Sequence, residues 1–254
     1  MGVRSVTRTL ALIITGATLA LSSLNGCGNT MLVGLQNLGN TCYLNAQLQC
    51  AYHIPLVRNL LEAPTVQTES AKALGNLFRQ LDSSSSNAVA PRELCQVLGI
   101  PVFEQQDSQE FWKLLLPTLQ LPELTKLYTG TLENYIVALD GSSREKRRPE
   151  PFLDLSLELS NSIESSLYKL FGEPELLSGD NGWRPERDED RIDAHKGTRL
   201  LSPENLPPIL QLHLKRFQVD WERNGSILKI NDRCAFPQCL SVPTANGETC
   251  EFEL

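Results

Sequence analysis

Histidine is scarce in this sequence: its 254 residues include only His53, His195 and His213. Histidine is the side chain that most often moves a proton near neutral pH, and it is also the commonest metal ligand. Few positions can therefore act as a general base. The seven cysteines include no Cys-x-x-Cys pair, so the spacing typical of a structural zinc site is missing as well.

No apolar run reaches the length of a membrane span. The longest, residues 10–24, is shorter than the roughly 20 residues that a spanning helix needs. Arg4 and Arg8 precede it, and this order resembles a secretory signal peptide. Two other interpretations stay open: a leader that is retained, or a wrongly assigned start codon, with Met31 as the alternative start. We therefore treat residues 1–30 as a separate apolar leader.

The charge balance and the cysteines narrow the class of protein. The formal net charge is -7, so there is no electrostatic reason to bind nucleic acid or an anionic membrane surface, and a basic partner is favoured. The cysteines are odd in number and irregularly spaced, which argues against a disulfide framework. Free thiols indicate a reducing compartment, the cytoplasm or the nucleus.

Hydrophobic periodicity predicts a helical first half and a strand-rich second half. Helices are expected from Cys42 to a limit at Pro55, over residues 71–81 and over 91–98. A further helix should begin at a cap at Asp107, with Phe111, Leu114 and Leu115 facing inward, and Pro117 should end or kink it. Alternating patterns predict strands over residues 131–139, 152–159 and 227–230, with a proline-started apolar segment at 206–217 and a short helix at 165–171. Residues 141–150 are expected to form a solvated loop or strand tip, and residues 180–196 a mobile charged insertion. This order predicts an α+β fold.

The most informative segment is GLQNLGNTCYLN at residues 34–45. A thiol at a helix N-terminus faces unpaired N–H groups and the positive end of the helix dipole, and both favour the nucleophilic thiolate. An amide such as Asn37 can donate a hydrogen bond to the oxyanion of a tetrahedral intermediate. The alternative interpretation is that Cys42 is merely a small buried residue at the start of a helix.

The segment closely resembles the cysteine box of ubiquitin-specific proteases, a family of papain-like cysteine deubiquitinases. The resemblance implies that Cys42 is the nucleophile and that Asn37 contributes to the oxyanion hole. Residues 105–111, QQDSQEF, resemble the second box of the family, in which Asp107 and Glu110 would hold the arginine-bearing tail of ubiquitin. The plainer alternative for these two residues is a helix cap followed by a solvated glutamate. Residues 206–217 resemble the palm strand, which places Phe217 at the tail-binding cleft.

The resemblance implies a helical thumb at residues 31–125, a β fingers insertion at 126–205 and part of a β palm at 206–254. Three departures from the family pattern are evident. None of the three histidines lies in a motif like the family's histidine box, which would follow a strand of the kind at residues 251–254. The expected fingertip regions, residues 136–151 and 180–201, contain no cysteine, so no zinc is predicted. Val219 stands where the family often has an aromatic residue.

The sequence therefore predicts a thiol-dependent deubiquitinase that needs no cofactor and acts on ubiquitin and ubiquitinated proteins, with the histidine part of its active site missing. Membrane and nucleic-acid partners are not expected. Two alternatives stay open: a ubiquitin-binding pseudoprotease without activity, or a non-functional fragment with an exposed sheet edge.

Overall fold

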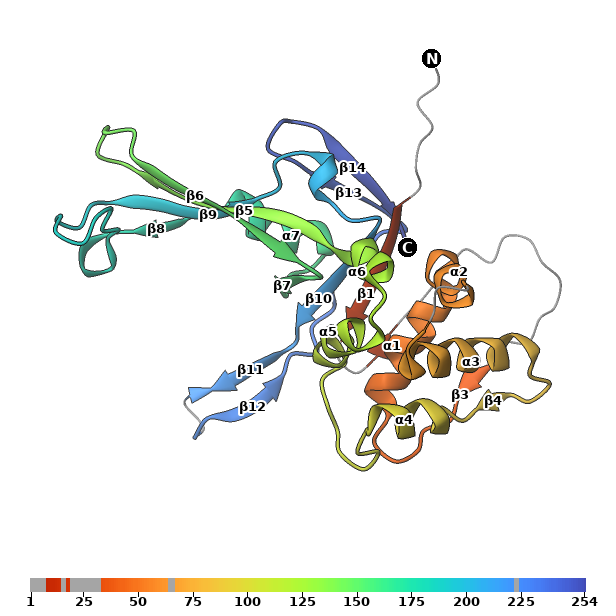
Figure 1. Ribbon diagram of the computed structural model, residues 1–254. Helices are drawn as coiled ribbons and strands as arrows, with labels where there is room; N and C mark the ends of the chain where they lie inside the picture. Colours follow the sequence, from red (N-terminus) through yellow and green to blue (C-terminus); the bar gives the residue numbers. More distant parts are fainter. Residues whose placement is uncertain (1–7, 15–16, 19–32, 64–66, 222–223) are drawn as a thin grey trace, which may run out of the picture. The chain divides into compact units, whose positions relative to one another are not determined.

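Six helices form one part of the chain (Figure 1), in a computed structural model that describes residues 8–14, 17–18, 33–63, 67–221 and 224–254. The helices are α1 (Cys42–His53), α2 (Pro55–Glu62), α3 (Glu69–Ser83), α4 (Arg92–Leu98), α5 (Ser108–Leu119) and α6 (Pro122–Tyr128). They belong to a compact unit, here called the helical unit, that comprises Thr9–Tyr128, Gln211–Leu214 and Leu254. Within it, β3 (Gly34–Leu35) pairs in parallel with β4 (Ala88–Val89).

Local sequence explains where these helices begin and end. The Thr68 hydroxyl caps α3 by accepting a hydrogen bond from the N–H of Ala71, and Asp107 caps α5. Gly99 ends α4 in the left-handed region, with φ 64°. The apolar stripes of the helices face inward, and the largest fully buried side chains are Leu44, Leu48, Leu74, Leu94, Trp112, Leu116, Leu119, Leu124 and Tyr128.

One expectation for this unit was wrong, and one alternative of a second is excluded. Leu114 does not face inward, because 61% of it is exposed; only Phe111 and Leu115 of the expected trio are buried. Pro117 does not end α5, which continues to Leu119. Pro117 has no N–H to donate within the helix, but α5 continues for two residues beyond it.

The rest of the chain forms a second unit, here called the strand-rich unit, that comprises Met1–Arg8, Thr129–Leu210 and Lys215–Glu253. One four-stranded sheet of this unit is antiparallel and has the order β6-β5-β9-β8, from Glu145–Phe152, Gly130–Ala138, Ala194–Arg199 and Glu175–Leu177. The other elements are β7 (Leu155–Glu158), α7 (Ile163–Gly172), two 3₁₀ turns at Gly179–Asn181 and Pro203–Asn205, β10 (Ile209–Lys215), β11 (Phe217–Asp220), β12 (Ser226–Lys229), β13 (Cys239–Pro243) and β14 (Thr249–Glu253). β10 continues from this unit into the helical unit.

The four-stranded sheet includes parts of two charged segments, one expected as a solvated loop or strand tip and the other as a mobile insertion. Residues 145–152, expected as part of a loop and the start of a strand, form β6, which pairs along the length of β5. The charged segment 180–196 ends in β9, and before it the backbones of Trp183 and Ile192 exchange two hydrogen bonds. β6 lacks a hydrophobic pattern because all of its residues except Phe152 are exposed. β9 is mostly half-buried, but its sequence, AHKGTR, contains no large apolar side chain.

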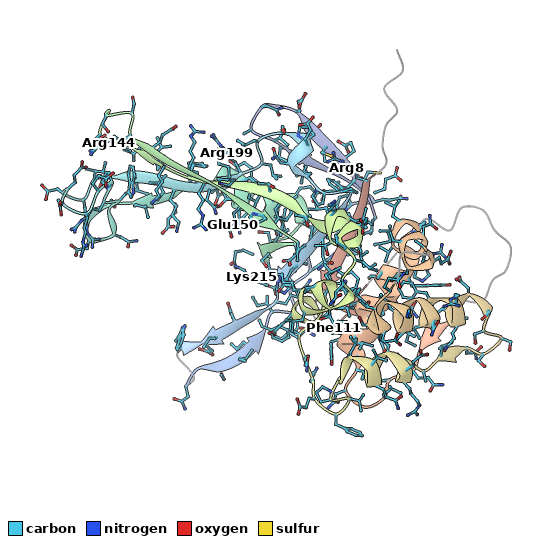
Figure 2. The ribbon with its side chains drawn as sticks, viewed as in Figure 1. Arg8, Phe111, Arg144, Glu150, Arg199 and Lys215 are labelled. Carbon is cyan, nitrogen blue, oxygen red and sulfur yellow. The ribbon has the colours of Figure 1, made fainter. Side chains whose placement is uncertain are left out.

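Charged side chains form ion pairs at the end of this sheet where β5 turns into β6. Figure 2 shows Arg144 at the tip of the β5–β6 hairpin, where it pairs with Asp140, 2.9 Å away, and with Glu189. Hydrogen bonds from Ser142, and then the Arg144 guanidinium, lower the pKa of Asp140 to about 2. Among the residues described, no cluster of His, Cys, Asp and Glu is arranged to hold a metal ion.

Part of the expected leader is structured. Arg8–Ile14 is β1, which pairs antiparallel with β2 (Ala17–Thr18). The Arg8 guanidinium donates to the carbonyl of Pro203 at 2.8 Å and lies over the ring of Phe252. The other residues of the expected leader lie outside the described residues. In the described parts of the chain, no helix has the length and apolar character needed to cross a membrane.

Candidate active site

Cys42 is the first residue of α1, and its side chain is exposed. The first turn of α1 contains no acidic residue, and no side chain caps it. The helix therefore presents its N–H groups and the positive end of its dipole to the thiol without an opposing carboxylate. This environment suits a nucleophilic thiolate.

A tight loop precedes Cys42 and orients the amide of Asn37. The Asn37 Oδ1 accepts hydrogen bonds from the backbone N–H groups of Gly39 and Thr41, each at 3.0 Å, and from the Thr41 hydroxyl at 3.1 Å. With the oxygen engaged in this way, the exposed Asn37 side chain keeps its two N–H donors for other groups.

Asn45, the last residue of the motif, anchors the other side of the loop. Its Nδ2 donates to the carbonyl of Gln36 at 3.0 Å, and Gln49, one turn later, donates to the carbonyl of Val33 at 3.1 Å. Sequence reasoning assigned no role to Asn45. Its spacing of three from Cys42 could have indicated one, because positions three and four apart share a helix face.

A distant segment is tied to the same loop through Asn40. The Asn40 N–H donates to the carbonyl of Val102 at 2.7 Å, and its Nδ2 donates to the carbonyl of Phe103 at 2.6 Å. Gly39 allows this approach, because a Cβ there would lie 2.7 Å from the Val102 oxygen. The contacts hold the ring of Phe103, 79% exposed, beside the nucleophile loop.

The second box lies next to the first, because the first turns of α1 and α5 meet. Tyr43 and Phe111 pack edge to face, with ring centroids 5.5 Å apart. Asp107 caps α5, its Oδ1 accepting from the N–H groups of Gln109 at 2.7 Å and Glu110 at 3.1 Å, while the Glu110 side chain is exposed. The helix-cap interpretation of Asp107 thus describes its local role, and binding of a ligand by Asp107 and Glu110 stays a prediction.

Phe217 is the one predicted site residue outside the helical unit. It begins β11 in the strand-rich unit and is 50% exposed. β11 and β12 form a separate two-stranded sheet, in which Phe217 is paired with Lys229 and Val219 with Ile227. The ring is thus available to a ligand on the surface of this hairpin.

Tyr43 follows Cys42 in α1. Burial, followed by Cys95, Cys42 and Glu104, raises the pKa of Tyr43, so this neighbour stays protonated at neutral pH. His53 is the last residue of the 12-residue helix that Cys42 begins, so their Cα atoms are about 16 Å apart along its axis. His195 lies within β9, and His213 lies in β10 between the fully buried Leu212 and Leu214.

His53 is expected to make stability depend on pH without any role in chemistry. Burial, and then the charge of Arg58, lower the pKa of His53 below 6.5, its value in an unfolded chain. The unfolded state therefore binds this proton first, and the free energy of unfolding should fall as pH drops below about 6.5. Urea unfolding between pH 7.5 and 5 should show a shallower fall for His53→Gln than for the wild-type protein. Equal slopes would contradict this assignment.

Comparison with known proteins gives a consistent result. The family model described as "Ubiquitin carboxyl-terminal hydrolase" matches residues 33–251. The chain is 34% identical to ubiquitin carboxyl-terminal hydrolase 47 of Drosophila melanogaster, over 84% of this chain and 15% of that protein. It is 34% identical to ubiquitin C-terminal hydrolase 13 of Arabidopsis thaliana, over 86% of this chain and 20% of that protein. The chain thus spans about a fifth or less of the length of these relatives.

Proposed function

The chain belongs to the ubiquitin carboxyl-terminal hydrolase family, and from this premise we propose that Cys42 is the nucleophile of a thiol-dependent deubiquitinase. The observation that carries the proposal is the pairing of an exposed cysteine at the start of α1 with an amide, Asn37, whose oxygen is fully engaged. The carbonyl attacked would be that of the C-terminal residue of ubiquitin, in an isopeptide or peptide bond.

The proposed reaction follows the chemistry of acyl transfer. The Cys42 thiolate attacks the carbonyl carbon, and the carbonyl oxygen takes up the negative charge, to which Asn37 Nδ2 donates. Collapse of this intermediate expels the amine and leaves ubiquitin as a thioester on Cys42, which water then hydrolyses. Asp107 and Glu110 would pair with the arginines of the ubiquitin tail, and Phe217 would contact the tail. No cofactor takes part.

The base that would activate the thiol is, in this proposal, none of the three histidines. Support comes from the position of His53 at the opposite end of α1. Within residues 1–254 the amine leaving group would then have no histidine to protonate it, and loss of a proton donor costs several orders of magnitude in rate. Transfer to Cys42 should therefore be far faster from a thioester, whose leaving thiolate needs no proton, than from an amide.

The partners proposed are ubiquitin and proteins that carry it, in the cytoplasm or nucleus, where a catalytic thiol stays reduced. A ubiquitin-binding protein without activity is the alternative, and the same distance between His53 and Cys42 favours it. Immunofluorescence of the tagged protein tests this location. A signal confined to the secretory pathway would contradict the proposal that the protein lies in the cytoplasm or nucleus.

The decisive experiment uses ubiquitin with an electrophile at its C-terminus and measures the intact mass of the protein. The wild-type protein and Cys239→Ala should gain the mass of one ubiquitin, whereas Cys42→Ala should not. Cys239 is the matched control because it is the other exposed thiol among the six described cysteines. Labelling that persists in Cys42→Ala would refute the nucleophile assignment. Saturable ubiquitin binding without any adduct would instead show that the protein binds ubiquitin without cleaving it.

A further inference from the structure

Thr41 occupies the N-cap position of α1 but does not act as a cap. A threonine there usually accepts a hydrogen bond from an N–H of the first turn. In this protein the side chain makes no cap hydrogen bond, although Thr41 is fully buried. Its hydroxyl points back into the loop instead, accepting from the N–H of Leu38 at 3.0 Å and donating to Asn37 Oδ1 at 3.1 Å.

This arrangement fixes the direction of the Asn37 amide. Three donors converge on Oδ1: the N–H groups of Gly39 and Thr41 and the hydroxyl of Thr41. If the amide were turned over, its NH₂ group would face two N–H donors, which cannot accept from it. The Thr41 hydroxyl oxygen accepts from the N–H of Leu38, and its own hydrogen is donated to Asn37 Oδ1. Nδ2 is therefore the atom that Asn37 presents outward.

The same rotation leaves the start of α1 open. Because the hydroxyl is used in the loop, the Thr41 side chain does not cover the N–H groups of the first turn of α1. One buried hydroxyl thus supports two features that an oxyanion needs, an outward amide and an uncapped helix end.

We propose that Thr41 is a positioning residue that holds the Asn37 amide in the orientation that stabilises the oxyanion. This inference rests on the proposed function, since it concerns the reaction of Cys42 with ubiquitin. Thr41 itself touches neither substrate nor reacting atoms. Its effect should therefore appear only in steps that form an oxyanion and only while Asn37 is present.

The test compares Thr41→Val, which removes the hydroxyl at nearly constant shape, with Thr41→Ser, which keeps it. Each variant reacts with ubiquitin carrying a C-terminal thioester, and the rate of adduct formation on Cys42 is followed by intact mass. Thr41→Val should react on the order of tenfold more slowly, less than the hundredfold that a misplaced group can cost. Thr41→Ser should react within about twofold of the wild-type protein.

Two controls separate positioning from a structural defect. Alkylation of Cys42 by iodoacetamide forms no oxyanion, so its rate, read by peptide mapping, should not change in Thr41→Val. In an Asn37→Ala background, Thr41→Val should cause no further loss, because a residue that acts through Asn37 cannot act without it. An unchanged thioester rate in Thr41→Val, or an equal loss in the Asn37→Ala background, would overturn the proposal.

Failure of the proposed function is distinguishable from failure of this inference. If the wild-type protein does not react with the thioester at all, the proposed function is wrong and the catalytic role of Thr41 falls with it. The orientation of the Asn37 amide can then still be tested by NMR, through the side-chain ¹H–¹⁵N resonances of Asn37. Thr41→Val should shift these resonances, and Thr41→Ser should preserve them. Unshifted resonances in Thr41→Val would show that the hydroxyl does not hold the amide.

Discussion

Replacing Asn37 by alanine is expected to slow the transfer of ubiquitin from a C-terminal thioester to Cys42 by about 10² to 10³-fold, the usual cost of losing one oxyanion donor. The reason is the arrangement around its amide, in which the oxygen accepts three hydrogen bonds and the nitrogen is left to donate. Single-turnover measurements by intact mass report this step alone, without the need for a proton donor to a leaving amine.

Asn37→Asp is the matched control for this prediction. The carboxylate retains an oxygen that can accept from Gly39 and Thr41, so the loop should keep its structure. It lacks N–H donors, however, and places a negative charge where the oxyanion forms. Asn37→Asp should therefore be at least as slow as Asn37→Ala while unfolding at the same urea concentration as the wild-type protein. Reaction of Asn37→Asp at the wild-type rate would exclude Asn37 from the oxyanion hole.

Replacing Trp112 by alanine is expected to lower the free energy of unfolding by about 3–5 kcal/mol, the range for truncation of a large buried side chain. Trp112 is fully buried on α5, and its ring packs edge to face against Tyr128 of α6, with centroids 5.4 Å apart. Because neighbouring backbone relaxes only in part, the lost ring would leave a cavity beneath the helix that carries Asp107 and Glu110. Urea unfolding measures the change.

Trp221→Ala is the control, because Trp221 is 84% exposed and its loss should change the free energy of unfolding by less than about 0.5 kcal/mol. Trp112→Phe refines the prediction. The Nε1 of Trp112 is buried and has no hydrogen-bond partner among the described residues, so phenylalanine removes an unsatisfied donor as well as volume. It should cost clearly less than alanine. Equal losses for Trp112→Ala and Trp221→Ala would mean that Trp112 does not lie in the core.

Strongly local features of this protein were predictable from its sequence. The helix that begins at Cys42, the cap at Asp107 and the helical stripe ending at Leu81 all depend on residues within a few positions of one another. Hydrogen bonds within a turn and apolar spacing suffice to specify them. The cysteine motif itself, with its glycines and amides, also identified the family to which the chain belongs.

Other features were decided by the tertiary structure. Leu114 follows an apolar pattern, yet 61% of it is exposed. β6 and β9 have charged sequences and become strands only because both pair with β5. Asn40 reaches Phe103, a residue 63 positions away, which no local pattern could indicate.

The loop before Cys42, residues 37–41, depends on both the local sequence and the folded structure. The motif placed Asn37 and Cys42 in one short segment, but it did not say which atom of the amide faces outward or what the threonine between them does. Those answers depend on three donors to the Asn37 oxygen: the N–H groups of Gly39 and Thr41, and the buried Thr41 hydroxyl, which bonds to Asn37 and Leu38 instead of capping α1. A hydroxyl has several acceptable partners within one turn of chain, and only the folded loop determines which of them it takes.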